Sequence, residues 1–319
     1  MVKTFWSETK KVSKFFLVTF IVVNMFFSIA RGEPILQKNN DREAELIVGY
    51  SSKIFLDVDI KDARAATKIW TDKLVRRMGS SFNKSEVVIF DELTTLENMI
   101  KAQLVDIIVL FSQEYLEVRN RSLLVPVFAS DYGKNFYYEL LIIVRRDSGI
   151  NQFSDLKKKR IVVELGQKES LPMLWLETLL AREGFFDPKA YFSNIKAGGR
   201  ASQVVLPVFF RQADGSIAGR KSFEMMTELN PQVGKELKVL TISPGFLTGV
   251  VCLRKDFYQQ HSTIITDTLK AFYEDPEGKQ IMMLFKVNKL LPFKYEYLES
   301  VESLLKEHRD LTTRMVKRK

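Results

Sequence analysis

The chain has 319 residues, enough for two lobes, and its 46% hydrophobic and 27% charged residues are typical of a globular protein. This composition excludes a collagen-like chain and wholesale disorder, and the single cysteine, Cys252, excludes a disulfide within one chain and is expected in a buried strand. The formal net charge is +9, but no run of basic residues is interleaved with aromatic side chains, so we expect no nucleic-acid partner.

The first residues have the pattern of a secretory signal peptide. An apolar stretch at residues 15–29 leads into small residues at Ser28 and Ala30, and lysines precede it: Lys3, Lys10, Lys11 and Lys14. We therefore expect residues 1–32 to be a signal peptide, cleaved after Ala30 or Gly32, and the protein to be periplasmic. The alternative is an uncleaved anchor, although the stretch is shorter than the about 20 residues of a membrane span.

Strand-like and helix-like patterns alternate from residue 45 onward. Alternation of this kind predicts largely parallel sheets covered by helices. The predicted strands are residues 45–49, 87–90, 106–111, 137–145, 161–165, 191–195, 216–219, 237–242 and 248–254. The predicted helices are residues 63–78, 93–103, 171–182, 202–211 and 222–229, with the segment 257–314 mainly helical.

This order of elements predicts two α/β lobes, the second inserted into the first. We expect the first lobe to comprise residues 33–135 and 243–319, and the second to comprise residues 136–242. The chain should pass between the lobes near residues 133–138 and again near residues 240–248. Each lobe is expected to be a mixed, mostly parallel sheet flanked by helices.

Three segments resemble one family of proteins. They are YYELLIIVRRDSGINQFSDLKKKRIVVE (137–164), ADGSIAGRKSFEMM (213–226) and SPGFLTGVVCLRKDF (243–257). Together with the order of elements, they are similar to type II periplasmic binding proteins, in particular the phosphate/phosphite/phosphonate substrate-binding proteins of ABC transporters. The resemblance implies a two-lobed clamshell that closes over a small polar ligand and delivers it to a membrane permease.

Ligand contacts are expected where strands lead into helix N-termini. In open α/β sheets the ligand crevice lies beyond the carboxyl ends of the strands, and free N–H groups at a helix start bind anions. The candidates in the first lobe are Tyr50, Ser51, Ser112 and Tyr132; those in the second lobe are Gln167, Glu169, Ser170, Arg200, Ser202 and Arg220. An arginine can hold a carboxylate or phosphate with two hydrogen bonds. Ser170 and Ser202 could instead cap their helices. The two arginines could be ordinary surface residues, and the two tyrosines could cover the edges of the core.

The sequence departs from the resembled family at one loop. Phosphonate-type members carry a Ser-Thr-Ser-like cluster where this chain has Glu169, Ser170 and Leu171, and an acidic residue where it has Gly219. A carboxylate at residue 169 opposes a phosphonate dianion, but it could meet the positive end of a zwitterion. It could also point to solvent in the first helical turn, where the helix dipole favours it.

The sequence carries little that favours an enzyme. The two histidines, His261 and His308, lie in polar helical surroundings, and the chain lacks the GxSxG, HExxH and Walker A motifs. We therefore expect no enzyme, no cofactor and no metal, and a monomer that binds a small molecule. A sensing component that reports its ligand to a membrane receptor remains the alternative to uptake, because both use the same closure of two lobes.

Overall fold

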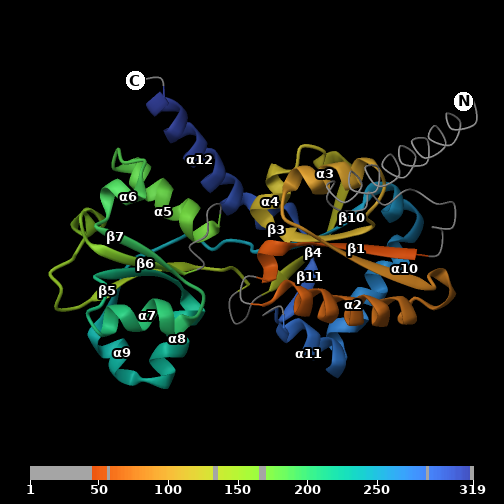
Figure 1. Cartoon of the computed structure of the whole chain (residues 1–319), viewed down its shortest axis with the longest axis horizontal. Coiled ribbons are helices and arrows are strands. Elements are labelled where there is room, and N and C mark those ends of the chain that lie inside the picture. The colour runs from red at the N-terminus through yellow and green to blue at the C-terminus, as the bar shows by residue number, and fades with distance from the viewer. Residues whose placement is uncertain (1–44, 56–57, 132–135, 165–169, 285–286, 317–319) are drawn as a thin grey trace, which may run out of the picture. The chain divides into compact units, whose positions relative to one another are not determined.

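The computed structural model describes residues 45–55, 58–131, 136–164, 170–284 and 287–316, and these residues form two separate sheets (Figure 1). The first sheet has the order β11-β4-β10-β3-β1-β2. Its strands are β1 (Glu45–Ser51), β2 (Lys84–Phe90), β3 (Ile107–Phe111), β4 (Leu124–Asp131), β10 (Gly249–Arg254) and β11 (Lys289–Pro292). β1 pairs in parallel with β2 and β3, whereas β10 is antiparallel to its neighbours β3 and β4. The carboxyl ends of β1, β2, β3 and β4 therefore lie at one edge of this sheet.

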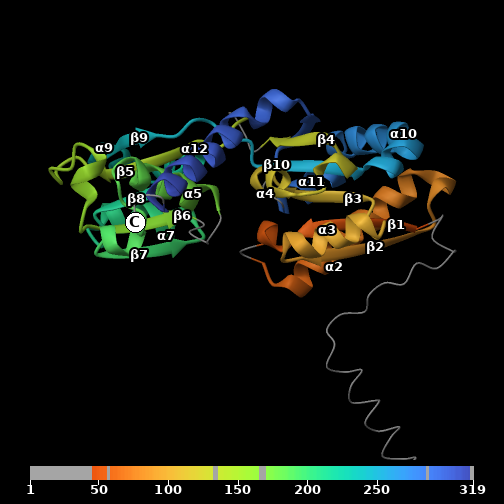
Figure 2. The same ribbon diagram turned by 90° about the horizontal axis from the view of Figure 1, so that it is seen from above.

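Helices cover both faces of the first sheet, as Figure 2 shows from a second direction. One core joins the sheet to α2 (Ile60–Arg77), α10 (Lys255–Glu274) and α11 (Pro276–Leu284) through Trp70, Phe272 and Met282. The other joins it to α3 (Leu93–Lys101) and α4 (Ser112–Glu117). The central strands β3 and β10 carry apolar side chains on both faces, as expected for strands of a sheet that helices cover on both sides.

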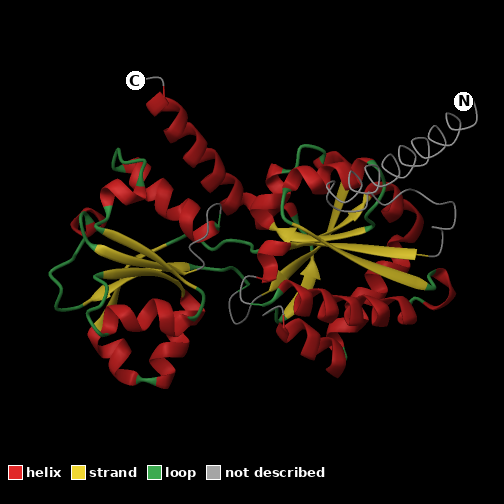
Figure 3. Ribbon diagram, viewed as in Figure 1, coloured by secondary structure: helices red, strands yellow, loops and turns green. Residues whose placement is uncertain are grey.

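The second sheet has the order β7-β6-β8-β5-β9. Its strands are β5 (Leu140–Arg145), β6 (Arg160–Glu164), β7 (Asn194–Gly198), β8 (Gly215–Gly219) and β9 (Leu237–Ile242). β6 is parallel to β7 and β8, and β5 runs antiparallel between β8 and β9. Helices again lie on both faces (Figure 3): α5 (Leu171–Arg182), α6 (Pro188–Tyr191) and α12 (Glu299–Val316) on one, α7 (Ala201–Phe209), α8 (Arg220–Leu229) and α9 (Pro231–Glu236) on the other.

The segments that connect the two sheets are held to one another. Tyr138 and Phe246 exchange two backbone hydrogen bonds, of 2.8 and 3.0 Å, so the connection from β4 to β5 and the connection from β9 to β10 run side by side at this point. Helix α12, which the predicted boundaries place with the first lobe, packs on α5 beside the second sheet. Its Val301 and Leu304 are buried in that core, and Arg182 of α5 forms an ion pair of 2.7 Å with Glu307.

The structure adds two strands that the sequence analysis did not predict, β4 and β11. β4 contains Pro126, which has no N–H to donate and argues against a central strand. The sheet accommodates it through a register shift, in which Val251 of β10 faces Phe128 and Cys252 faces Pro126. β11 is only four residues long and lies in a stretch whose apolar spacing favours a helix.

Two predicted elements differ in position. The strand predicted at residues 191–195 begins only at Asn194, because Asp187 accepts a hydrogen bond of 2.9 Å from the Lys189 N–H and starts the short helix α6 with Pro188. The strand predicted at residues 137–145 begins at Leu140. Cys252 is buried in β10 as expected, and burial raises the pKa of its thiol.

A charge cluster at the end of β5 should make stability depend on acid pH. The Asp147 carboxylate accepts hydrogen bonds from Arg145 and Arg211, which lower its pKa to about 2. Because this value lies below the pKa of about 3.9 in an unfolded chain, the stabilisation is fully present above pH 4 and is lost as the pH falls towards 2. We expect the melting temperature of Asp147→Asn to depend less on pH between 4 and 2 than that of the wild type. Equal pH dependence of the two proteins would contradict this.

Candidate functional site

The carboxyl edge of the first sheet is organised around a buried carboxylate. Glu114, only 2% exposed, lies in the first turn of α4. It accepts hydrogen bonds from the Ser51 hydroxyl (2.9 Å) and the Phe111 N–H (3.0 Å), and Lys53 lies 3.4 Å away. The chain therefore places its own negative charge at the start of this helix, where the sequence predicted an anion. Ser51 contacts Glu114 in this structure.

The second predicted hydroxyl of this edge also has a structural partner. Ser112 is fully buried, and its Oγ donates to the Leu247 carbonyl over 2.5 Å. Its backbone N–H donates to the Thr248 carbonyl over 2.7 Å. Ser112 thus fastens the segment that enters β10 to the end of β3, which gives this hydroxyl a role in holding the edge together.

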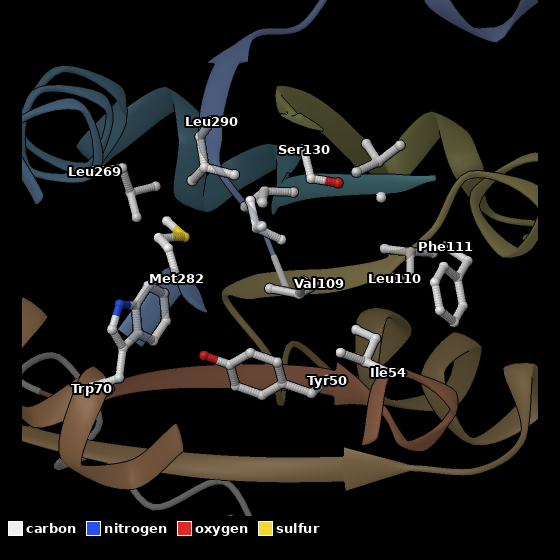
Figure 4. A pocket seen from close by; sticks show the side chains of 14 residues that line it. Tyr50, Ile54, Trp70, Val109, Leu110, Phe111, Ser130, Leu269, Met282 and Leu290 are labelled. Atoms are coloured by element: carbon white, nitrogen blue, oxygen red, sulfur yellow. The ribbon is translucent and has the colours of Figure 1, made fainter. Parts of the chain in front are cut away.

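Tyr50 points to the opposite face of the first sheet from Ser51. Its side chain is 2% exposed, and its ring centre lies 5.9 Å from that of Phe55 and 6.2 Å from that of Trp70. Burial raises the pKa of the Tyr50 hydroxyl. The ring forms part of the wall of an apolar cavity (Figure 4), so Tyr50 lies in a pocket, though not one of polar character.

A second carboxylate organises the edge of the second sheet. Glu164 ends β6, is 8% exposed and accepts hydrogen bonds from the Gly219 N–H and, over 2.5 Å, from the Ser222 hydroxyl. It thereby satisfies the first groups of α8. The predicted ligand residue Arg220 is placed beside Glu139, with 2.5 Å between its Nε and a carboxylate oxygen. The positive charge of Arg220 is therefore already balanced within the protein.

The remaining described candidates lie at two other helix starts of the second sheet. Ser170 occupies the N-cap position of α5, yet its hydroxyl makes no cap hydrogen bond and, within the described parts of the chain, this buried oxygen has no partner. Arg200 occupies the N-cap position of α7 and Ser202 lies in its first turn, both exposed. The group that closes the start of α7 is Gln203, which accepts from the Gly199 N–H over 3.1 Å. Neither serine therefore makes a capping hydrogen bond in the described part of the chain.

Three predicted site residues, Tyr132, Gln167 and Glu169, lie outside the described residues. Sequence reasoning also missed the three glutamates that shape the two edges, Glu114, Glu139 and Glu164. One of them, Glu164, could have been found from the sequence. It ends the apolar run RIVVE (160–164), and an ionised carboxylate at the end of a buried strand needs hydrogen-bond donors around it. Within the parts of the chain that the structure covers, no group of three or more His, Cys, Asp or Glu side chains is arranged to hold a metal ion. In the same residues, no helix has the length and apolar character of a membrane span.

Replacing Glu164 should measurably weaken the protein. In Glu164→Ala the Gly219 N–H remains buried without an acceptor, so we expect a loss of about 1–3 kcal/mol in the free energy of unfolding. Urea titration followed by circular dichroism measures this loss. Glu183→Ala, an exposed glutamate at the end of α5, is the matched control and should change stability by less than about 0.5 kcal/mol. Equal losses in the two variants would show that Glu164 does not support α8.

Several solved structures share the fold of this chain. XAC2383 from Xanthomonas citri, bound to ATP, superposes with a TM-score of 0.62 at 13% identity, over 85% of this chain and 98% of the other. PhnD1 from Prochlorococcus marinus, in complex with methylphosphonate, superposes with a TM-score of 0.56 at 13% identity, over 82% of this chain and 97% of the other. A binding protein component of an ABC phosphonate transporter from Pseudomonas aeruginosa superposes with a TM-score of 0.53 at 15% identity, over 86% of this chain and 99% of the other. This is the fold of the type II periplasmic binding proteins, as the sequence predicted.

The family follows from the sequence itself. Residues 57–297 match the family described as ABC transporter, phosphonate, periplasmic substrate-binding protein. The chain belongs to this family of solute-binding proteins, as its motifs predicted. No curated protein sequence matches the chain.

Proposed function

We propose that this protein is the periplasmic component of an ABC-type uptake system and that it closes, as a monomer with its signal peptide removed, over a small polar solute. The observation that carries the proposal is the family match across both sheets, residues 57–297. Membership implies a small-molecule ligand and a membrane permease as partner. The helix starts at the carboxyl edges, where ligands of open α/β sheets bind, support the same function.

The charges at these edges support a solute that is not a simple dianion. Glu114 and Glu164 already accept the N–H groups of two helix starts, and Glu139 balances Arg220. A dianion at these points would meet fixed carboxylates, whereas a zwitterion or a monoanion would be repelled less. We propose Ser170, Arg200 and Ser202 as the groups that meet the acidic end of the solute. Tyr132, Gln167 and Glu169 stay in the proposed site on the sequence argument alone.

A thermal-shift screen of the purified chain tests the proposal. The panel contains phosphate, methylphosphonate, aminoalkylphosphonates, amino acids, small carboxylates and ATP. A solute present at about 100 times its Kd, and bound only by the folded protein, adds about 2.7 kcal/mol of stability. We expect at least one zwitterion or monoanion to give such a shift. If no compound of the panel raised the melting temperature, the result would contradict solute binding of this kind.

Arg200→Ala then tests where the hit binds. Arg200 is exposed at the start of α7, so its removal should leave the melting temperature of the free protein unchanged. Loss of a charge-assisted hydrogen bond should weaken binding by about 1.5–3 kcal/mol, a factor of roughly 10 to 150 in Kd. Arg309→Ala, an exposed arginine of α12, is the matched control. Equal affinity of Arg200→Ala and the control would remove Arg200 from the site.

A further inference from the structure

The first sheet contains a cavity that the proposed polar contacts do not use. It has a volume of about 60 Å³ and lies between the sheet and the helices α2, α10 and α11 (Figure 4). Its wall is almost wholly apolar, and Val109, Val251, Leu269, Met282 and Leu290 contribute to it. A water needs about 10–15 Å³ of such space, so this cavity has room for roughly four water-sized groups, or a chain of a few carbons.

The cavity lies at the edge of the sheet where solutes bind in this class of fold. Tyr50 is next to the last residue of β1, Phe111 is the last residue of β3, and Ser130 is next to the last residue of β4. Gly249, which begins the antiparallel strand β10, belongs to the same edge because it pairs with Phe111. In open α/β sheets the ligand crevice is found beyond this edge.

Part of the cavity wall remains accessible although it lies in the middle of the sheet. Val109 pairs with Tyr50 on one side and Val251 on the other, in the middle of the sheet, yet it is only half-buried. Ile54 and Phe111 are half-buried as well. A central strand that is covered by helices normally buries such a valine, so the described part of the covering layer leaves space beside Val109.

Two polar atoms of the wall have no hydrogen-bond partner among the residues that the structure describes. Among the described residues, neither the Trp70 Nε1 nor the Ser130 Oγ has one, although these side chains are only 6% and 5% exposed. Buried polar groups are normally satisfied, so each such group requires an explanation. Trp70 can only donate, whereas Ser130 can donate or accept, and a single oxygen atom in the cavity could serve either.

We propose that this cavity receives the organic tail of the solute: a short alkyl group, with room for one hydrogen-bond acceptor, attached to the polar head that the sheet edges bind. This assignment rests on the proposed solute-binding function. It defines the solute class as small amphiphiles, with a charged or zwitterionic head and a tail of a few carbons. A pocket nearly devoid of polar groups selects such a tail by the apolar area that it removes from water.

A chain-length series measured by titration calorimetry on the full chain tests the assignment. The ligands are methyl-, ethyl-, propyl-, butyl- and hexylphosphonate and the corresponding 1-aminoalkylphosphonates, with the n-alkanols from ethanol to hexanol as headless probes. Each buried methylene should tighten binding about fourfold until the cavity is full, after which affinity should stop rising.

The matched variants are Val109→Phe, which fills the cavity, and Val239→Phe, which enlarges a half-buried valine of β9 in the second sheet. Val109→Phe should abolish the gain in affinity from the ethyl to the butyl compounds. Val239→Phe should keep the gain.

The outcomes separate the cavity from the solute-binding function. Binding of the methyl compounds with no dependence on chain length, or with a dependence that survives Val109→Phe, overturns the tail assignment while solute binding stands. Binding of no phosphonate, combined with alkanol binding that Val109→Phe removes, also overturns it, because the cavity then serves a separate apolar molecule. If no head group and no alkanol binds, both the assignment and the proposed function for these head groups fail.

The two polar atoms provide an independent check. Ser130→Ala removes an oxygen that has no partner among the described residues, so the free protein should be at least as stable as the wild type. A ligand whose tail carries an ether or hydroxyl oxygen, such as 2-methoxyethylphosphonate, should bind several-fold more weakly to Ser130→Ala, and propylphosphonate should bind equally to both. Equal loss for the two ligands would overturn the assignment of the oxygen.

Discussion

Removing helix α12 by ending the chain after Leu298 should unfold the part of the protein built on the second sheet. The helix contributes Val301, Leu304 and Leu305, at most 8% exposed, to the core that also contains Trp175. Burial of three such side chains contributes about 5–9 kcal/mol, as much as the whole stability of many domains. Hydrogen exchange should then show β5, β6 and β8 losing protection, whereas β1 and β3 keep it.

The control for this deletion ends the chain after Arg314. It retains the three buried side chains and the Arg182–Glu307 ion pair, so its exchange pattern should match that of the full chain. Protection of β5, β6 and β8 in the shorter protein would show that α12 is dispensable and would contradict the packing described here. A loss of protection in both sheets would indicate a single cooperative unit instead of a local effect.

The second large effect is expected at a buried ion pair on the first sheet. Arg254, at the end of β10, lies 2.9 Å from the Asp106 carboxylate, and both side chains are about nine-tenths buried. The other carboxylate oxygen accepts the Ile47 N–H over 2.9 Å, so the pair fixes the start of β3 against β1 and β10. Arg254→Met leaves a buried carboxylate without its cation, and we expect a loss of about 3–5 kcal/mol in urea titration.

The double variant Asp106→Leu/Arg254→Met separates the ion pair from ordinary packing. Replacing a buried pair with apolar residues is often close to neutral, so the double variant should recover most of the stability that Arg254→Met loses. A double variant as unstable as the single one would show that the cost lies elsewhere, for instance in the Arg254 hydrogen bond to the Val105 carbonyl.

The same variant should respond to pH in a defined direction. Burial is the largest influence on Asp106 and raises the pKa of its carboxyl, while Arg254 lowers it. Without Arg254, the folded protein should bind this proton more tightly than the unfolded chain does. Stability must then rise as the pH falls from neutral towards the unfolded pKa of about 3.9. We expect the deficit of Arg254→Met relative to wild type to shrink between pH 7 and 4; a constant deficit would contradict this.

The sequence predicted those helices and strands whose formation depends mainly on a local pattern of apolar residues. Residues 171–182 form a helix as predicted, and the buried runs at β1, β3 and β10 form strands, because apolar periodicity decides these elements. β4 was missed because its Pro126 is accommodated by a register shift in a neighbour far away in sequence. Tertiary contacts of this kind have no local signature.

The candidate site was harder to predict than the fold, for an identifiable reason. The sequence correctly places hydroxyls and arginines near strand ends, but it does not show which of them already have partners. Ser112 reaches Leu247 across 135 positions, and Arg220 reaches Glu139 across 81. Whether a polar side chain is available to a ligand depends on such distant contacts, and only the folded chain contains them.

The three passages of the chain between the sheets have a consequence for proteolysis. The chain leaves the first sheet after β4, returns before β10, and leaves again after β11 to form α12 on the second sheet. A protease that cuts any single passage leaves the two others covalently intact. The nicked protein should therefore run as one species in a native gel and separate into fragments only after denaturation. Neither half corresponds to a continuous stretch of the gene, so each half can be produced alone only by joining distant segments.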